Sequence, residues 1–274
     1  MLPVRRAPTD SWNDQFVKET LPEAVAPPAV ETNLAWLARL RTADKTFAKP
    51  GDVVLLGGSS LSDFRLRVAQ SHMRDDLTPS YWSLVGVLDD GDRLLTAPLW
   101  PLLTPDVVPI TNGITSLALS EFDDPVLWPN IAIVRFPGAR LPPVTCVDDL
   151  RKQRSMIDIP ALVLHWLAFV WGAGSAPNPL VNGSGIPSAV MTEAAFALAE
   201  VELTPGLAAA SSCPEAIYQS AKWWHSFYEQ AAGGRRRKVN RPIGQYVTRE
   251  TMPTYHEPKR PDLRPSATAP KAGA

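Results

Sequence analysis

Residues 81–99, YWSLVGVLDDGDRLLTAPL, decide the fold class because they predict two strands joined by a tight turn. Apolar residues lie on both sides of Asp89-Asp90-Gly91-Asp92. Asp and Gly tolerate the positive φ angles that a tight hairpin turn requires. The stretch therefore predicts a β-hairpin, and with it an antiparallel sheet.

Two further strands are predicted on either side of this hairpin. GDVVLLGG (51–58) is a compact apolar run between glycines, and NIAIVRFPG (130–138) is an apolar run closed by Pro-Gly. GGSSLS (57–62) lacks the Lys-Ser/Thr ending of a phosphate-binding loop, which favours a tight turn. DDPVLWPN (123–130) is interpreted as a loop whose paired aspartates form turns rather than act as acids or bases.

Helical periodicity dominates the second half of the chain. Helices are predicted over 158–172, 187–201 and about 214–230. Strands first and helices afterwards favour an α+β fold, with a small antiparallel sheet packed on helices, over a doubly wound sheet. The most apolar stretch, 159–174, is interrupted by His165 and is shorter than the ~18–20 apolar residues that span a bilayer, so a buried helix is expected.

Two shorter helices are predicted before the hairpin. The first lies within 31–47 and is amphipathic, and Pro-Gly stops the segment soon after it. Its apolar side carries three leucines at a spacing of three, Leu34, Leu37 and Leu40. The second helix covers 62–73, and its apolar face is predicted to hold Phe64, Val68 and His72.

Composition divides the chain into three parts. Residues 1–30 contain five prolines without sustained periodicity and predict an N-terminal arm, and 31–232 form the domain. From residue 235 to the end, ten Lys and Arg face three Asp and Glu, so 233–274 are predicted to be a basic, Pro-rich tail. Such a tail cannot bury enough apolar surface to fold alone. It is either solvated and disordered, or becomes ordered on an acidic protein or a nucleic acid.

Overall charge, cysteine content and the N-terminal sequence bear on the binding partners, the disulfides and the cellular location of the protein. The formal net charge of −1 gives the whole molecule no strong field toward nucleic acid or an anionic membrane. Two cysteines, Cys146 and Cys213, allow one disulfide at most. The first 16 residues, MLPVRRAPTDSWNDQF, lack the apolar run of a secretory signal, which predicts a cytoplasmic protein without a membrane span.

Three segments together resemble the circularly permuted papain-like group of the NlpC/P60 superfamily (the YiiX/LRAT-like group). They are the strand GDVVLL, the hairpin, and the segment GIPSAVMTEAAFALAEVELTPG (185–206). In that group a "GD-apolar" strand precedes a strand that opens on the catalytic His, and a later helix opens on the nucleophilic Cys. VELTPG (201–206) and SCPEAIYQS (212–220) are similar to two phrases that follow this helix. The resemblance covers about residues 50–225 and implies a permuted papain-like fold with extended arms.

The resemblance also implies that the catalytic positions are degenerate. Pro187 stands at the nucleophile position, Leu84 at the His position, and Thr96 near the third polar residue. A papain-like site needs a thiolate activated by a helix N-terminus and an adjacent His. Proline has no nucleophile and leucine cannot transfer a proton. Pro187 nevertheless suits the first turn of a helix, so the helix is expected to persist without the reaction.

Two residues are kept as fallback nucleophiles. Ser188 neighbours the lost nucleophile, but its Oγ would project about 100° around the helix from the Cys position. Cys213 lies in SSCPEAIY, which is typical of an N-cap followed by Pro at the first helical position. Cys146 has apolar neighbours and is interpreted as a buried thiol.

No metal or cofactor is expected. The histidines show neither an i,i+4 pair nor a Cys-x-x-Cys companion; they are His72, His165, His225 and His256. His165 is interpreted as a core histidine. His225 is interpreted as a helix-face residue beside Trp223 and Trp224.

These observations lead to three functional hypotheses. The first is a catalytically inactive papain-like domain, a structural or protein-interaction subunit of a larger bacterial assembly that binds partners through its arms and aromatic residues. Its partner-binding residues are predicted to be Arg235, Arg236, Arg237, Lys238, Trp223 and Trp224. The alternative is an active cysteine or serine hydrolase or amidase acting on peptidoglycan or another amide. A third is a module that binds a peptide or an acyl chain in the former groove.

Overall fold

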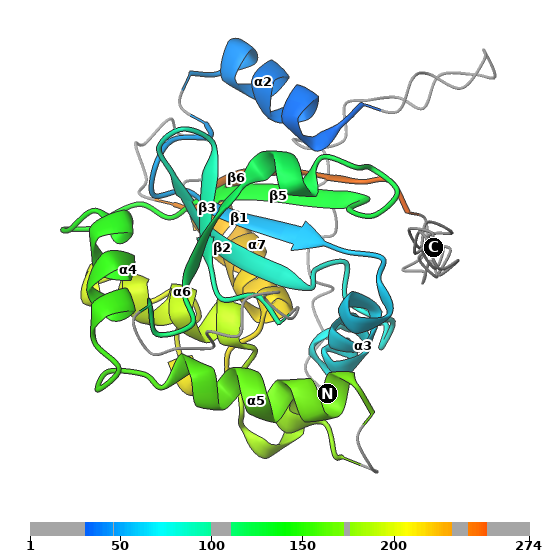
Figure 1. Cartoon of the computed structure of the whole chain (residues 1–274). Coiled ribbons are helices and arrows are strands. Elements are labelled where there is room, and N and C mark those ends of the chain that lie inside the picture. The colour runs from blue at the N-terminus through cyan, green and yellow to red at the C-terminus, as the bar shows by residue number, and fades with distance from the viewer. Residues whose placement is uncertain (1–30, 46, 100–110, 173–175, 232–240, 251–274) are drawn as a thin grey trace, which may run out of the picture.

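The computed structural model describes residues 31–45, 47–99, 111–172, 176–231 and 241–250. Helices and strands are combined in a mixed α+β architecture built on a six-stranded antiparallel sheet with the order β4-β3-β2-β1-β5-β6 (Figure 1). The strands are β1 (Val53–Gly57), β2 (Leu84–Asp89), β3 (Arg93–Thr96), β4 (Thr115–Ala118), β5 (Asn130–Arg135) and β6 (Ile243–Thr248). The α-helices are α2 (Asn33–Ala43), α3 (Leu61–Ala69), α4 (Pro143–Lys152), α5 (Ile159–Val170), α6 (Pro187–Leu198) and α7 (Pro214–Ala231). Short 3₁₀ turns are η1 (Ser71–Met73), η3 (Leu119–Phe122), η4 (Pro179–Asn182) and η5 (Ala209–Ser211).

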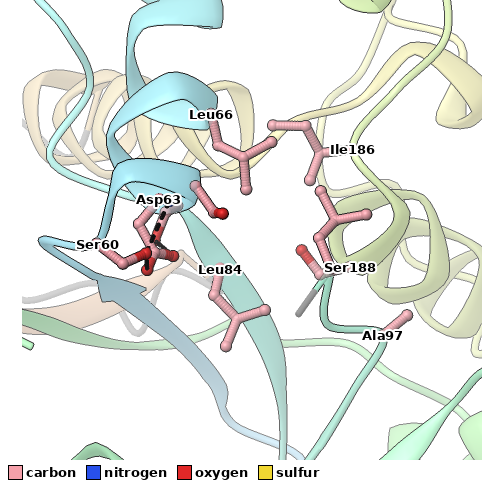
Figure 2. A pocket seen from close by; sticks show the side chains of 10 residues that line it. Ser60, Asp63, Leu66, Leu84, Ala97, Ile186 and Ser188 are labelled. Carbon is pink, nitrogen blue, oxygen red and sulfur yellow. Dashed lines mark hydrogen bonds between the residues drawn. The ribbon is translucent and has the colours of Figure 1, made fainter. Parts of the chain in front are cut away.

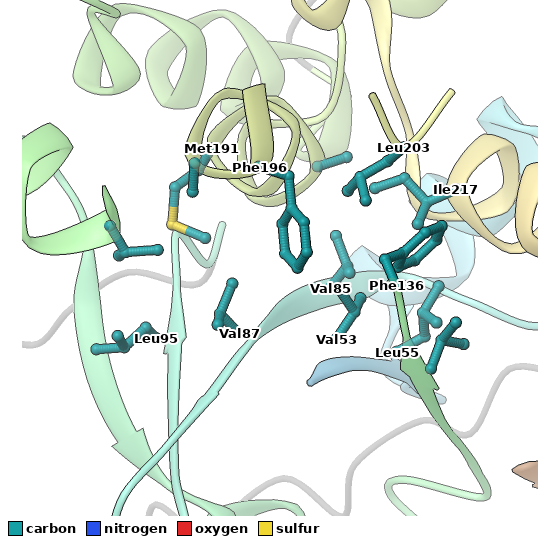
Figure 3. Packing of buried hydrophobic residues seen from close by; sticks show 14 of the residues in the cluster. Val53, Leu55, Val85, Val87, Leu95, Phe136, Met191, Phe196, Leu203 and Ile217 are labelled. Atoms are coloured by element: carbon teal, nitrogen blue, oxygen red, sulfur yellow. The ribbon is translucent and has the colours of Figure 1, made fainter. Parts of the chain in front are cut away.

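The sheet is covered on both faces, which explains why β1 is apolar without alternation. Val53 and Leu55 face a core formed with α4, α6 and α7, whereas Val54 and Leu56 face α2 and the η3 turn. The larger core is filled by Phe136 and by side chains of α6 and α7 (Figure 3). A strand buried on both faces is expected to read as a continuous apolar run.

The predicted hairpin is confirmed. β2 and β3 pair antiparallel, with Val87 opposite Leu95. At the turn between them, Gly91 and Asp92 have φ angles of 68° and 57°. These left-handed conformations are the ones that Gly and Asp adopt most readily, which is why the turn falls at this point.

The other predicted elements are confirmed with modest shifts of their ends. α2 lies within 31–47 and buries Leu37 and Leu40 together with Trp36. The strands at 51–58 and 130–138, and the three helices of the second half, are also present. The predicted arm at 1–30 lies outside the described residues.

The predicted apolar face of the helix at 62–73 is wrong. Val68 and His72 are exposed and Phe64 is only partly buried, whereas α3 turns Asp63, Leu66 and Arg67 inward. The physical reason is that two charged residues on this helix have buried hydrogen-bond partners. Apolar periodicity cannot identify a face that is half polar.

The predicted boundary at residue 233 also needs correction, because part of the basic tail belongs to the sheet. β6 pairs antiparallel with the whole length of β5. Its Tyr246 packs edge-on against Tyr218 of α7, with ring centroids 5.9 Å apart. The tail prediction failed because composition measures what a segment can bury alone, whereas β6 completes an existing sheet edge.

A buried ion pair fixes the end of β6 to α3. Arg67 is fully buried and forms a salt bridge with Glu250, whose side chain is 7% exposed. Arg67 also donates through Nε to Ser80 O at 2.7 Å and through Nη1 to Gly58 O at 2.9 Å. Asn130 of β5 donates to the same carboxylate at 3.1 Å. The guanidinium therefore joins four segments of the chain.

Candidate functional site

A small cavity of about 70 Å³ lies where α3 and α6 begin, beside the first residue of β2. One side is polar and is formed by Ser60, Ser62, Asp63 and Ser83, and the other side includes Ser188. The apolar lining comes from Leu66, Leu84, Ala97, Leu99 and Ile186 (Figure 2). Ordinary ligand pockets measure about 300–1,000 Å³, so this one has room for a few waters or one small aliphatic group.

The polar wall is organised around the carboxylate of Asp63. Ser60 Oγ donates to Asp63 Oδ2 at 2.5 Å, and Ser83 Oγ donates to Oδ1 at 2.8 Å (Figure 2). Ser60 also caps α3, since its Oγ accepts from the Asp63 backbone N–H. Gly58 provides the space, because a Cβ there would lie 2.4 Å from Asp63 Oδ2. The carboxylate is thus fixed in place.

Burial raises the pKa of the Asp63 carboxyl above its usual range, although hydrogen bonds from Ser60 and Ser83 oppose the shift. The folded protein therefore holds this proton more tightly than the unfolded chain does. Between the two pKa values the native state binds more protons, so stability falls as pH rises and then levels off above the folded-state pKa.

Asp63→Asn removes this titration. We expect the free energy of unfolding of the wild type, minus that of the variant, to decrease as pH rises from about 4 through the raised pKa of Asp63. Urea unfolding at a series of pH values measures the difference. Asp90→Asn at the exposed hairpin turn is the control for the change in net charge. A difference that stays constant or grows with pH would contradict the assignment.

The structure brings one resemblance position, Leu84, together with the fallback nucleophile Ser188. Leu84, at the start of β2, and Ser188, at the start of α6, both line the cavity (Figure 2). Ser188 is 1% exposed, and its Oγ accepts from the Val85 N–H at a long 3.4 Å. Thr96 is buried and donates to Val85 O at 2.7 Å, and Pro187 is buried in the first turn of α6. Neither of the last two lines the cavity.

The chemistry available in this cavity is hydrogen bonding and apolar contact. The described residues of the lining carry hydroxyl groups and one carboxylate, and none of them carries an imidazole, a thiol or an amine. Activation of Ser188 as a nucleophile would need a base within hydrogen-bond reach, whereas its Oγ accepts a hydrogen bond from the backbone N–H of Val85. The arrangement can therefore hold a small group but lacks the pair needed for acyl transfer.

Cys213 is placed behind the cavity rather than in it. It is 1% exposed and packs in a cluster with Leu66, Leu99 and Ile186. Burial raises the pKa of its thiol to about 12. Because the thiolate is the nucleophile, a thiol with this pKa is unreactive near neutral pH. Cys146 is likewise buried, in the larger core, and burial raises its pKa.

The histidines are dispersed. His72 is exposed at η1, and His225 is buried with its Nδ1 2.8 Å from Pro242 O. The interpretation of His165 as a core residue is wrong, because it is exposed on the outer side of α5. His256 lies outside the described residues. In the described part of the chain, no three His, Cys, Asp or Glu side chains come together as a metal site would need.

Of the predicted partner-binding residues, Trp223 and Trp224 form part of an aromatic cluster on α7. Trp223 stacks on Phe227 at 5.1 Å and Trp224 stacks on Tyr228 at 5.5 Å. The two stacks stand nearly at right angles, and Trp223 is 57% exposed. The four basic residues Arg235, Arg236, Arg237 and Lys238 lie outside the described residues.

Sequence reasoning missed the polar wall of the cavity. A signal was present, because Ser60-x-x-Asp63 has the spacing of a helix N-terminal capping pattern. That pattern predicts a helix start, and it does not predict that the Asp side chain is buried. Ser83 precedes Leu84, the position that the resemblance assigns to the His. Its hydrogen bond to Asp63 is visible only in the three-dimensional structure.

Comparison of the chain with protein-family models, with curated proteins and with solved structures finds no match. Fold and site define an α+β protein whose antiparallel sheet and flanking helices enclose a small, partly apolar cavity. Among the helices that the structure describes, none combines the length and the hydropathy that a bilayer-spanning segment requires.

Proposed function

We propose that this chain is a catalytically inactive, papain-like domain that acts as a structural or protein-interaction subunit of a larger bacterial assembly. The observation that carries the proposal is the cavity that contains both Leu84 and Ser188. In an active member of the resembled group, a His would stand at the position of Leu84 and a Cys at the position of Pro187, the residue before Ser188. Here an isobutyl group and a proline ring stand at those two positions, and neither can attack a carbonyl or transfer a proton.

The starts of α6 and β2 are consistent with a protein that keeps the papain-like fold but has lost the catalytic reaction. The first residue of β2, Leu84, and the second residue of α6, Ser188, line the same cavity, and this proximity supports the proposal. Proline at the first helical position needs no hydrogen-bond partner for its nitrogen, so the substitution leaves the helix intact.

The surface that would serve association is the aromatic cluster on α7, Trp223, Trp224, Phe227 and Tyr228. Exposed aromatic residues contribute strongly to protein interfaces because each buries a large area at a small entropic cost. The basic run at 235–238 follows this helix in the sequence and would favour an acidic partner protein.

Chemical probes test the proposal against the alternative, an active cysteine or serine hydrolase or amidase. Incubation of the folded protein with iodoacetamide and with a fluorophosphonate is expected to leave both Cys213 and Ser188 unmodified, as read by peptide mass spectrometry. Both cysteines should react with iodoacetamide once the protein is unfolded in urea, which is the control for probe access. Stoichiometric, heat-sensitive labelling of either residue in the folded protein would establish the hydrolase instead.

A further inference from the structure

The outer side of α5 is an apolar surface that the described residues leave uncovered. Leu164 is 60% exposed and Trp171, which caps the helix, is 61% exposed. The opposite side of the same helix is packed, since Trp166 and Val170 are buried in a cluster with α3 and η4. In Figure 1, α5 lies at the outside of the molecule, below α6.

Three exposed residues and the partly buried Ala168 follow the spacing of a helix-packing seam. Ala161, Leu164, Ala168 and Trp171 are separated by three, four and three residues, which are successive a and d positions of a heptad. We call these four residues the α5 seam. Within it, small and large side chains alternate. A solvent-facing heptad pattern of this kind is what one helix presents to another.

The α5 seam is complementary to itself when two copies run antiparallel. A two-fold axis at the level of Trp166 places Ala161 opposite Trp171 of a second copy, and Leu164 opposite Ala168. Every layer then joins a large side chain to a small one. A parallel arrangement would instead oppose like with like, with Leu against Leu and Ala against Ala, which leaves one layer crowded and the next empty.

The outer side of α5 carries little charge. Residues 159–172 contain no Asp, Glu, Lys or Arg, and their one titratable side chain is His165, which is exposed beside Leu164. An isologous contact needs such a surface, because each residue must find its counterpart on the same patch.

From this geometry we infer that the protein forms a two-fold symmetric dimer in which α5 packs antiparallel on α5 of a second copy. Trp171 and Leu164 are the large side chains that fill the contact, and Ala161 and Ala168 receive them. The seam is only three turns long, which is short for a standard interface that buries about 800 Å² per partner. We therefore expect weak association, with a Kd on the order of micromolar.

Sedimentation velocity of the full chain over a range of concentrations tests this dimer. The wild type is expected to shift from monomer to dimer as its concentration passes through the micromolar range. Leu164→Glu should weaken association at least tenfold, because it places two carboxylates within the contact. Leu141→Glu, at a residue that is 54% exposed before α4, is the matched control and should leave the dimer unchanged. Far-UV circular dichroism and the Tm verify that each variant is folded.

A size exchange tests the register. Leu164→Ala empties a layer and Ala168→Leu crowds one, so each is expected to weaken the dimer. The double variant Leu164→Ala/Ala168→Leu restores one large and one small residue in that layer and should recover most of the wild-type affinity. A double variant no better than either single variant would overturn the antiparallel register. A monomer at all concentrations, including one that binds vesicles of phosphatidylcholine and phosphatidylglycerol, would overturn the dimer itself.

Discussion

Arg67→Met is expected to lower the free energy of unfolding by about 3–5 kcal/mol, which is the usual cost of breaking a buried ion pair. Methionine has a similar volume but offers no donor. Glu250 would be left as a buried carboxylate whose guanidinium partner is gone, and the carbonyl groups of Gly58 and Ser80 would each lose a hydrogen bond. Urea unfolding at pH 7, analysed by linear extrapolation, measures the loss.

Arg39→Met is the matched control for this prediction. Arg39 forms a bidentate pair with Glu31, but its side chain is 47% exposed, so the loss should be below about 1 kcal/mol. Glu250→Gln tests the same site from the other side, since it removes the charge while keeping a hydrogen-bond acceptor. Equal losses for Arg67→Met and Arg39→Met would show that the Arg67 pair contributes no more than a surface pair.

Removal of β6 should have a still larger effect. A chain that ends at residue 240 loses β6, the carboxylate that pairs with Arg67, and the ring that covers Tyr218. Since whole domains are stable by only about 5–15 kcal/mol, we expect this chain to be unfolded or to melt far below the full-length protein. Circular dichroism and thermal melting measure the effect.

A chain that ends at Glu250 is the control for the truncation. It keeps all of β6 together with the Arg67 ion pair, and it is expected to retain the Tm of the full-length protein. If the chain ending at 240 melts at the same temperature as the chain ending at 250, then β6 adds nothing to the sheet and the domain does end near residue 232.

The elements that sequence reasoning found are those with strong local signals. The hairpin at 81–99 has a turn whose residues permit positive φ, and α6 has an apolar repeat with proline at its first position. β6, IGQYVT, has a weaker signal, because Gly244 and Gln245 interrupt its apolar residues and its neighbours in the sequence are basic and proline-rich. Its stability comes from pairing with β5, more than 100 residues earlier in the chain. Non-local pairing of this kind leaves little trace in a short window of sequence.

α4 and β4 show two other reasons for a miss. α4 has a readable signal, since Pro143 starts it and Cys146, Val147 and Leu150 line its inner face. The interpretation of Cys146 as a buried thiol does not use this pattern. β4 has four residues, TSLA, and pairs with β3 at one edge of the sheet. So short a strand is defined by its neighbour rather than by its own sequence.

For the candidate site, the resemblance predicted positions but not chemistry. It indicated Leu84 and the start of α6, and the structure places Leu84 and Ser188 at one cavity. It gave no indication of Asp63, because a charged residue near a helix start is usually solvated. Burial of that carboxyl depends on Gly58, Ser60 and Ser83, which approach it from a turn, a helix cap and a strand.

The contact between Arg249 and Asn33 brings the beginning and the end of the described chain close together. Arg249 Nη1 donates to Asn33 Oδ1 at 2.7 Å, so the residue that follows β6 and the first turn of α2 share one corner of the domain. Residues 31 and 250, to which the segments 1–30 and 251–274 are joined in the sequence, therefore lie near this corner. A partner that recognises a short motif in each would bind the second at high effective concentration once it holds the first. Two weak contacts, tethered at one corner, would then act with the avidity of a single strong one.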